Sequence, residues 1–490
     1  MKLKEKVVQS VKWLFIAQLS SQLIRTLVTI LVIRDFDARE MSFVALSQTI
    51  TGFLEIFSTL GLNAAIISKK DITKRDLQNI FGLVLVINAV LLAIVMGGAN
   101  YFSSFYNTPE VADILRVSGW SFLFVALGFI PNAMLVKDMR FKATSIIQVI
   151  AGLSGALISY VCAKNGLGYW ALVYGGIAYP VIGTILKIAL SPTMVWPRFS
   201  LSESLRHISF GTYVMAGGIT WYFFVTMDIV IAGRFWTAET LGVYAIAVQI
   251  AAMSLNRTIP LLKQVALPAF SRSIVQDRSL LESHVVKALK LSIFASVPMF
   301  WGVAATATLA VPIFLGENWR AATLPLAFLC IGAPFRFLIE LLSPAVVAAG
   351  YPKEVFKNGV VISLVMVIFY LVVVLNSTSP ALLAAVWMIV YPMLSLHASH
   401  RYCKWLQINS MAIYKGIFPI LMSGLAMLAV VLFMVLNLSD AMNRALLLGL
   451  AVATGVIIYI GALFLIDRKT LMEVFSMYRG SKKKAPAQAK

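Results

Sequence analysis

Long apolar segments separated by short polar gaps run along almost the whole chain, from Trp13 to Ile466. A helix needs about 20 mostly apolar residues to cross the roughly 30 Å of hydrocarbon in a bilayer, because each residue adds about 1.5 Å. About fourteen segments are long enough. The predicted spans are residues 13–33, 41–68, 78–97, 113–135, 144–163, 169–190, 208–233, 238–256, 291–314, 321–349, 358–376, 380–399, 411–436 and 445–466. The pattern predicts an all-α polytopic membrane protein.

The lysines and arginines fall almost entirely in every second gap between these segments. If the N-terminus is cytoplasmic, 32 of the 41 cations lie in cytoplasmic gaps and only six in external gaps. Cytoplasmic loops of membrane proteins carry such an excess. The sequence therefore predicts that both termini are cytoplasmic and that the number of spans is even.

Composition agrees with lipid as the main solvent. The chain is 60% hydrophobic and 13% charged, whereas a soluble domain is about 25% charged. The formal charge of +20 is explained by cations that set the topology and contact anionic lipid headgroups. No nucleic-acid partner is expected, and membrane lipids are.

A weak internal repeat organises the predicted spans. A shift of 201 residues aligns Met41–Gln48 with Gly242–Gln249 and keeps the direction of the spans, so the repeat is parallel. Two lobes of six helices with a site between them is a common transporter plan. The sequence thus predicts four parts, which are an N-terminal lobe, a C-terminal lobe, two additional spans and a basic cytoplasmic tail: residues 1–195, 196–405, 406–466 and 467–490.

Polar residues form a stripe along each of the first two predicted spans. Gln18, Gln22 and Arg25 share one face of span one, and Gln48 and Glu55 share one face of span two. Counting from the cytoplasmic end of each span places Arg25 and Glu55 at about the same depth, roughly 18–20 Å into the membrane. Polar groups at this depth face a cavity or another helix rather than lipid. Arg25 would then meet an anionic substrate group while Glu55 tunes it or carries a proton, or the two would form a structural ion pair.

Span ten carries a second pair of opposite charges. Arg336 and Glu340 stand four residues apart, a spacing at which a helix can neutralise its own charges. Pro325, Pro334 and Pro344 flank the pair and predict a kinked or broken helix, which at membrane depth usually lines a cavity. Both a self-satisfied pair and a cavity role remain open.

Other polar residues carry weaker signals. Asp228, in the external third of span seven near Arg234, fits a cap or an interface pair as well as a substrate contact. The three cysteines and the four histidines show no metal-ligand spacing, and no phosphate-binding loop is present, so neither a metal, another cofactor nor ATP hydrolysis is expected.

Several stretches resemble the polysaccharide transporter family, the O-antigen and exopolysaccharide flippases of the multidrug/oligosaccharidyl-lipid/polysaccharide exporter superfamily, and are most similar to the colanic-acid type. The stretches that carry the resemblance are Asp228–Arg234, Leu241–Tyr244, Gln264–Arg272, Leu315–Trp319 and Ala348–Pro352.

The resemblance implies a transporter rather than an enzyme. The expected activity is translocation of an oligosaccharide repeat unit linked to a polyisoprenyl diphosphate, from the inner to the outer leaflet of the bacterial inner membrane, by alternating access around a cationic cavity. It also implies coupling to a proton or sodium gradient and contact with the polymerase machinery. Arg25 is the predicted contact for the diphosphate, since arginine is a permanently charged and bidentate partner for phosphate.

Two other functions fit parts of the pattern. A multidrug antiporter of the same superfamily would export organic cations, and its cavity should hold more carboxylates than arginines. A membrane glycan polymerase or ligase would need catalytic groups on a large external loop. The longest predicted external gap, around residues 99–112, has only about fourteen residues, which argues against such an enzyme.

Overall fold

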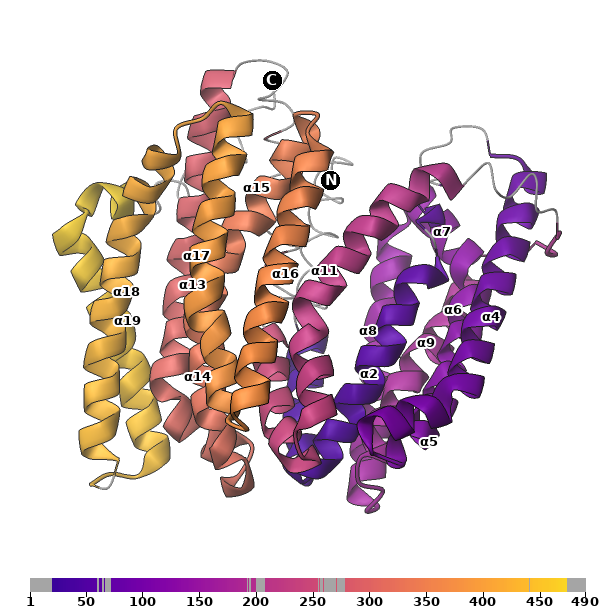
Figure 1. Cartoon of the computed structure of the whole chain (residues 1–490), viewed down its shortest axis with the longest axis horizontal. Helices are drawn as coiled ribbons and strands as arrows, with labels where there is room; N and C mark the ends of the chain where they lie inside the picture. Colours follow the sequence, from indigo (N-terminus) through magenta and orange to yellow (C-terminus); the bar gives the residue numbers. More distant parts are fainter. Residues whose placement is uncertain are drawn as a thin grey trace, which may run out of the picture. The chain divides into compact units, whose positions relative to one another are not determined.

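The described part of the chain is helical throughout, in agreement with the predicted fold class (Figure 1). The structure is a computed structural model. It describes residues 20–59, 72–191, 208–253, 278–439 and 441–473, together with 61–63, 66, 193, 195–199, 255, 259 and 270. Side chains are described for these residues except 208–216 and 278–280.

The helices follow the predicted spans, but the exact number of fourteen is not confirmed. Within the described residues, 11 helices are long and apolar enough to cross a membrane, or 12 if one bent pair counts as a single span. The helices Ser20–Ile33 and Ala238–Met253 coincide with two further predicted spans and are shorter than a membrane-crossing helix.

Contacts divide the chain into two compact units, residues Met1–Gly242 and Val243–Lys490. The helix α11 (Ile208–Phe235) belongs to unit 1, where its Tyr222 hydroxyl donates to the carbonyl of Thr49 at 2.5 Å. The four parts predicted from the repeat, with a first boundary after residue 195, stay a prediction.

Besides α11 and the helix Ser20–Ile33, unit 1 contains α2 (Ala38–Ser58), α4 (Lys74–Tyr106), α5 (Glu110–Gly119), α6 (Ser121–Leu127), α7 (Phe129–Lys137), α8 (Phe141–Lys164) and α9 (Trp170–Leu190). Capping boxes start α2 at Asp37 and α4 at Thr73, because in each the cap and the third helical residue satisfy each other's backbone N–H. Asn107, in the left-handed conformation, ends α4.

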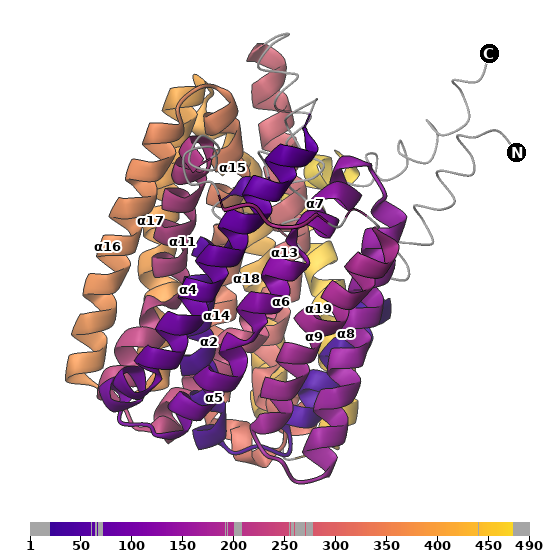
Figure 2. The same ribbon diagram turned by 90° about the vertical axis from the view of Figure 1, so that its right-hand side faces the viewer.

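Helices α8 and α9 lie side by side and pack through small residues (Figure 2). Ala151, Gly155 and Ser159 recur every fourth position on α8, and all three are buried. Gly155 and Ser159 meet Gly175 of α9 so closely that a methyl group on Gly155 would lie 2.8 Å from the Gly175 carbonyl oxygen. Small residues allow such close backbone approach, which drives helix pairing in lipid.

The span formed by α5, α6 and α7 is bent by 45° between Leu127 and Phe129. Pro131 in the first turn of α7 cannot donate a backbone hydrogen bond, which is a common cause of bending. The carbonyl of Phe124 just before the bend accepts the hydroxyl of Thr184 from α9 at 2.7 Å. The bend therefore couples this span to α9.

Unit 2 contains α13 (Arg278–Phe314), α14 (Thr323–Gly332), α15 (Arg336–Ala348), α16 (Pro352–Asn376), α17 (Pro380–Leu406), α18 (Ser410–Leu438) and α19 (Arg444–Ile466), with 3-10 turns at Glu317–Ala322 and Ala333–Phe335. The second turn contains Pro334 and breaks the tenth predicted span as expected. The Trp301 side chain donates to the carbonyl of Ile331 just before this break at 3.0 Å.

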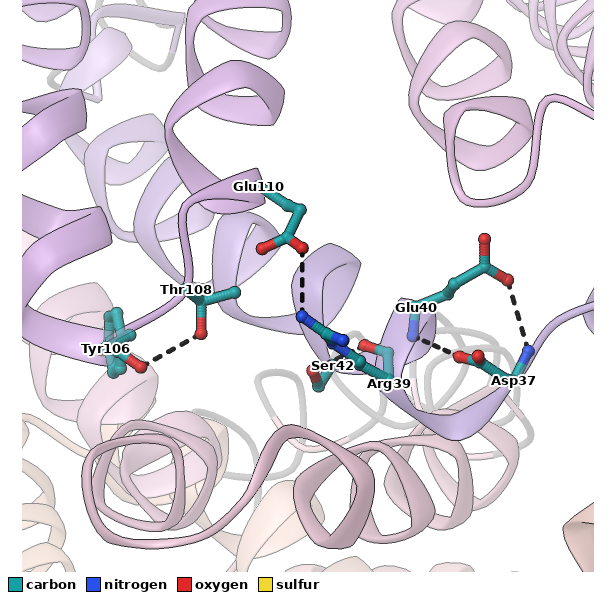
Figure 3. A network of polar contacts seen from close by, with 7 residues as sticks. All are labelled: Asp37, Arg39, Glu40, Ser42, Tyr106, Thr108 and Glu110. Atoms are coloured by element: carbon teal, nitrogen blue, oxygen red, sulfur yellow. Dashed lines mark hydrogen bonds and ion pairs between the residues drawn. The ribbon is translucent and has the colours of Figure 1, made fainter.

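A polar network closes the end of unit 1 at which α2 begins, called here the Asp37 end (Figure 3). Arg39 pairs with Glu110 of α5 at 3.4 Å, and Lys164 at the end of α8 pairs with Asp35 at 2.9 Å. Glu40 accepts the backbone N–H of Tyr169, the N-cap residue of α9, at 3.2 Å. These contacts connect the starts of α2, α5 and α9 and the end of α8.

Replacing Gly168 with alanine should destabilise unit 1 more than the same change at Gly166. Both glycines have positive φ, 51° and 75°, which costs an L residue roughly 1–2 kcal/mol. Only at Gly168 would the added methyl group also overlap a carboxylate oxygen of Glu40, while nothing lies within 4 Å at Gly166. Thermal denaturation in detergent should give a clearly lower midpoint for Gly168→Ala than for Gly166→Ala. Equal midpoints would show that Glu40 gives way without cost.

Candidate functional site

A polar cavity of ≈ 500 Å³ lies within unit 1. Its polar lining side chains come from α2, α5, α6, α7, α8 and α9: Ser47, Gln48, Thr51, Glu55, Ser118, Ser121, Asn132, Thr144, Gln148, Tyr179, Thr184 and Lys187. The size falls within the roughly 300–1,000 Å³ that small-molecule sites occupy. Lipid-facing surfaces do not carry so many polar groups, so the sequence of unit 1 builds an internal site at membrane depth.

Local features of α9 shape one wall of this cavity. Gly176 and Gly183 line it and leave space, and nothing lies within 4 Å of a methyl group built on Gly176. Pro180 removes the backbone N–H that would bond the carbonyl four residues earlier, which belongs to Gly176. The freed carbonyl adds a hydrogen-bond acceptor to the wall.

The cavity has two charged lining residues among those that the structure describes, Glu55 of α2 and Lys187 of α9. Each stands seventeen residues after the first residue of its helix, Ala38 or Trp170. Both are therefore about 25 Å along the helix from the Asp37 end. Within the described residues, no ion pair or hydrogen bond holds either side chain, so the two opposite charges share a level without pairing.

Arg25 lies beside this cavity but is not among its lining residues. Its guanidinium packs on α8 where Gly152 leaves room, and a methyl group on Gly152 would lie 2.6 Å from Nη1. Nη2 donates to the side chain of Gln22 one turn earlier, while Nε is buried with no hydrogen-bond partner among the described residues. Arg25 is thus a half-buried cation inside a membrane unit.

Arg25 and Glu55 form no ion pair, and they stand at different levels of their helices. Arg25 is eight residues from Ile33, the last residue of its helix at the Asp37 end, or about 12 Å. Glu55 is about 25 Å from the same end. Helix α2 ends at Ser58 with Thr59 as its cap. The prediction of equal depth took residue 68, the expected cytoplasmic end of span two, as its starting point. Their roles as substrate contacts stay predictions.

The remaining predicted residues of the first two spans divide between two places. The Gln22 side chain accepts the hydrogen bond from Arg25 described above. Gln48 lines the cavity about two turns before Glu55 on the same helix. Gln18 lies outside the described residues.

Asp228 of α11 is completely buried in unit 1, and its Oδ1 accepts the backbone N–H of Ile229 at 2.8 Å. It is not among the residues that line the polar cavity. The same helix ends with Arg234, which donates to the carbonyl of Phe105 at 3.0 Å rather than to Asp228. A role for Asp228 in substrate contact stays a prediction.

Arg336 belongs to the packed interior of unit 2, and Glu340, about one turn later on α15, is half-buried. Arg336 is 7% exposed, and its guanidinium carbon lies 5.8 Å from the centre of the Trp387 ring on α17, within the range of a cation–π contact. The buried Tyr391 hydroxyl lies within range of electrostatic interaction with both Arg336 and Glu340. Neither residue lines the cavity in unit 1.

Unit 2 has a cavity of its own, ≈ 450 Å³ in volume, with an almost entirely apolar lining. It lies between α13, α15, α17 and α18 and includes Pro334, Leu338 and Phe418. Its polar members are His400, whose Nδ1 is 3.0 Å from Ser410 Oγ, and Tyr414, which donates to the carbonyl of Leu396. Both are already satisfied, so this cavity presents apolar surface.

By the alternation of charge along the sequence, Lys187 counts among the 32 cytoplasmic cations, and Gln148 and Thr184 have no predicted role. Lys187 is three residues from the end of α9, where a lysine usually reaches the interface. The available signal was its spacing: Gly176, Pro180, Gly183, Thr184 and Lys187 recur at three- and four-residue steps and mark a small and polar helix face.

The described residues contain no group of three or more histidine, cysteine, aspartate or glutamate side chains placed to hold a metal ion. The groups in the unit 1 cavity are mostly hydroxyls and amides, which donate and accept hydrogen bonds but do not ionise. The arrangement can bind a polar solute within the membrane.

Apolar helices that enclose a polar cavity define a multi-pass membrane protein of the transporter type. The family model described as polysaccharide biosynthesis protein matches residues 36–324, and the chain belongs to this family. The predicted family resemblance is confirmed.

Curated relatives are similar over most of the chain. The chain is 23% identical to the teichuronic acid biosynthesis protein TuaB of Bacillus subtilis, over 84% of this chain and 85% of that protein. It is 22% identical to the lipopolysaccharide biosynthesis protein WzxC of Escherichia coli, over 75% and 76%. It is also 22% identical to the succinoglycan biosynthesis transport protein ExoT of Rhizobium meliloti, over 99% and 98%.

Solved structures share the fold. The lipid II flippase MurJ in an inward closed conformation matches with a TM-score of 0.74 at 13% identity, over 94% of this chain and 99% of MurJ. An inward-facing multidrug resistance transporter of the MATE family matches with a TM-score of 0.60 at 14% identity, over 82% and 99%. The chain therefore shares its fold with both of these membrane proteins.

The contact between Gly152 and Arg25 leads to a testable expectation. Gly152→Ala should displace the guanidinium, because the new methyl group would lie 2.6 Å from Nη1 and 2.8 Å from Cδ. If Arg25 contacts the substrate, transport should fall several-fold while the amount of folded protein stays unchanged. The matched control is Gly97→Ala on α4, where nothing lies within 4 Å. Normal transport by a folded Gly152→Ala variant would show that the position of Arg25 is not critical.

Proposed function

We propose that this protein is a flippase that moves an oligosaccharide linked to a polyisoprenyl diphosphate from the inner to the outer leaflet of the bacterial inner membrane. The product would serve the assembly of exopolysaccharide or lipopolysaccharide. The observation that carries the proposal is a polar cavity inside a helical membrane unit of a chain that belongs to the polysaccharide biosynthesis family. The similarity to ExoT, a succinoglycan biosynthesis transport protein, and the fold shared with the lipid II flippase MurJ support it.

The physical problem of the reaction fits these features. A diphosphate and a chain of sugars cannot cross the hydrocarbon unaided, because each polar group would lose its hydrogen bonds to water. A protein solves this with a polar path for the head group while the lipid tail stays in the bilayer. Arg25 supports such a path, since a guanidinium group offers a bidentate partner to phosphate.

The proposal includes alternating access, cytoplasmic termini, and coupling to a proton or sodium gradient. The excess of lysines and arginines in every second gap supports an orientation with both termini in the cytoplasm. Glu55, a cavity carboxylate without an ion pair in the described part of the chain, supports cation coupling. Contact with the polymerase that uses the flipped unit belongs to the proposal as well.

A multidrug antiporter is the second candidate, because a MATE transporter shares the fold. Export of organic cations calls for an excess of carboxylates in the binding cavity. Here the unit 1 cavity has one carboxylate and one ammonium group among its described lining residues. This balance favours a polar uncharged or anionic cargo over an organic cation.

The test is genetic and chemical. Deletion of the gene should abolish surface polysaccharide and accumulate lipid-linked oligosaccharide on the cytoplasmic side. Expression of the wild-type protein should restore the polysaccharide, Arg25→Lys should restore it partly, and Arg25→Ala should restore less than a tenth. Drug hypersensitivity of the deletion strain with normal polysaccharide would overturn the proposal in favour of the antiporter. Full restoration by a stably expressed Arg25→Ala would reject only the assignment of Arg25.

A further inference from the structure

The charges of the unit 1 cavity indicate which part of the cargo it can hold. Glu55 and Lys187 are its two charged lining residues among those described, so the formal charge of the lining is zero. A diphosphate carries two or more negative charges and needs an excess of cations, as in phosphate sites built from arginine and lysine clusters. Because Glu55 lies at the level of Lys187, its negative charge would repel a phosphate bound beside this lysine. The cavity is therefore poorly suited to the diphosphate.

A sugar ring places different demands on its site. Each hydroxyl both donates and accepts hydrogen bonds, so an unpaired carboxylate and an unpaired ammonium group at one level can be satisfied by neighbouring hydroxyls of one ring. The amides of Gln48, Gln148 and Asn132 offer both donors and acceptors around them. Phe122 and Tyr179 also line the cavity and supply aromatic surface for the apolar face of a ring.

The position of the cavity at membrane depth explains why its two charged side chains need a ligand or water. An ion in a membrane interior is costly unless another group solvates it. Direct contact between Glu55 and Lys187 would satisfy both, yet the structure holds them apart. A space that keeps opposite charges separate favours a solute that bridges them by hydrogen bonds.

We propose that the unit 1 cavity is a sugar-binding site that takes uncharged rings of the carried oligosaccharide, with Glu55 and Lys187 as the residues that determine this specificity. The inference rests on the proposed flippase function and adds that the sugars and the diphosphate bind at different places. The cavity receives sugar hydroxyls, and the diphosphate is bound elsewhere, outside this neutral lining.

Protection of a cavity thiol tests the site directly on the purified full-length protein. Gly176→Cys places a thiol on the cavity wall, in a background where the half-buried Cys162 is replaced by serine and the buried Cys330 and Cys403 are kept. The probes are the lipid-free oligosaccharide repeat, released from the surface polysaccharide of the source cells, and inorganic pyrophosphate. The oligosaccharide should slow maleimide labelling of the introduced thiol at least several-fold, and pyrophosphate should not. Protection by pyrophosphate, or none by the oligosaccharide, would overturn the proposal.

Three variants separate sugar binding from other roles of the two charges. Glu55→Gln and Lys187→Gln each leave the lining with one net charge, and each should weaken protection by the oligosaccharide about tenfold, because a hydrogen bond to a charged group is lost and an unbalanced charge remains. The double variant Glu55→Gln/Lys187→Gln is neutral again and should bind better than either single variant. If Glu55 acts only as a proton carrier, Glu55→Gln should give the same protection as the parent protein, which would contradict its role in specificity.

The outcome is distinguishable from failure of the proposed function. Loss of the flippase function would appear as normal surface polysaccharide in the deletion strain, whatever the labelling shows. Failure of the sugar-site proposal alone would appear as a wild-type protein that restores polysaccharide while single variants of Glu55 and Lys187 bind and transport as well as the parent. Elution of each variant as a single folded species from a sizing column ensures that lost protection reflects binding.

Discussion

Gly175→Leu is expected to prevent unit 1 from folding, so that little or no folded protein reaches the membrane. A Cβ on Gly175 would overlap the Ser159 hydroxyl and would lie 2.7 Å from the Gly155 carbonyl oxygen. The serine side chain can rotate, but the carbonyl is backbone, so α8 and α9 must separate. Overpacking costs roughly 1–3 kcal/mol in ordinary cores and more where backbones touch. The measurements are the amount of monodisperse protein purified from the membrane and its thermal denaturation midpoint in detergent.

The neighbouring Gly176 provides a matched control with the opposite expectation. It is exposed to the unit 1 cavity, and nothing lies within 4 Å of a methyl group built there. Gly176→Leu should therefore fold and denature close to the wild-type temperature, while its side chain fills part of the cavity and lowers polysaccharide export at least tenfold. Failure of both variants to fold would indicate that α9 tolerates no leucine in this turn. Normal export by Gly176→Leu would contradict a transport role of the cavity.

The sequence predicts the helices well because their causes are local. Apolar runs such as residues 169–190 and 380–399 correspond to α9 and α17, since a membrane-crossing helix satisfies all its backbone hydrogen bonds internally. The break near Pro334 was also predicted, because proline lacks the donor that a continuous helix needs. Each of these features depends only on residues within one segment.

The candidate site could be predicted only in part, because its geometry depends on contacts between segments. Glu55 and Gln48 were recognised from their polar stripe and do line the cavity. Lys187 was not, since only the crossing of α8 and α9 determines whether a lysine near a helix end faces the cavity or the interface. The relation of Arg25 to Gly152 was invisible too, because a glycine 127 positions away gives no local sign that it makes room for a side chain.

These contacts also explain how unit 1 keeps an open polar space in its interior. The small residues at Gly155 and Gly175 hold α8 and α9 close on one side. On the other side, Pro180 and the bend before Phe129 turn backbone away from regular packing. Close contact in one place and irregular backbone in another leave a cavity whose walls are fixed by packing, as a binding site requires.

Arg336→Met is expected to destabilise unit 2 by about 1–3 kcal/mol, because the buried guanidinium is lost and the half-buried Glu340 loses the closest positive charge on its own helix. Methionine keeps most of the volume under the Trp387 ring, so the loss would be mainly electrostatic. Glu340→Gln should be destabilising too, and the double variant should be more stable than Arg336→Met alone, since neither charge is then left without compensation. The measurement is the denaturation midpoint of each protein and the coupling energy between the two changes.

An exposed arginine of the same unit provides the reference for this prediction. Arg401 pairs with Glu354 at 3.6 Å, and its side chain is 39% exposed, so Arg401→Met should cost at most about 1 kcal/mol. A large loss for Arg336→Met beside a small one for Arg401→Met would identify Arg336 and Glu340 as a structural pair, one of the two alternatives that the sequence left open. An Arg336→Met protein as stable as the wild type that exports no polysaccharide would instead support the cavity role, and the interior position of Arg336 would then have to open during transport.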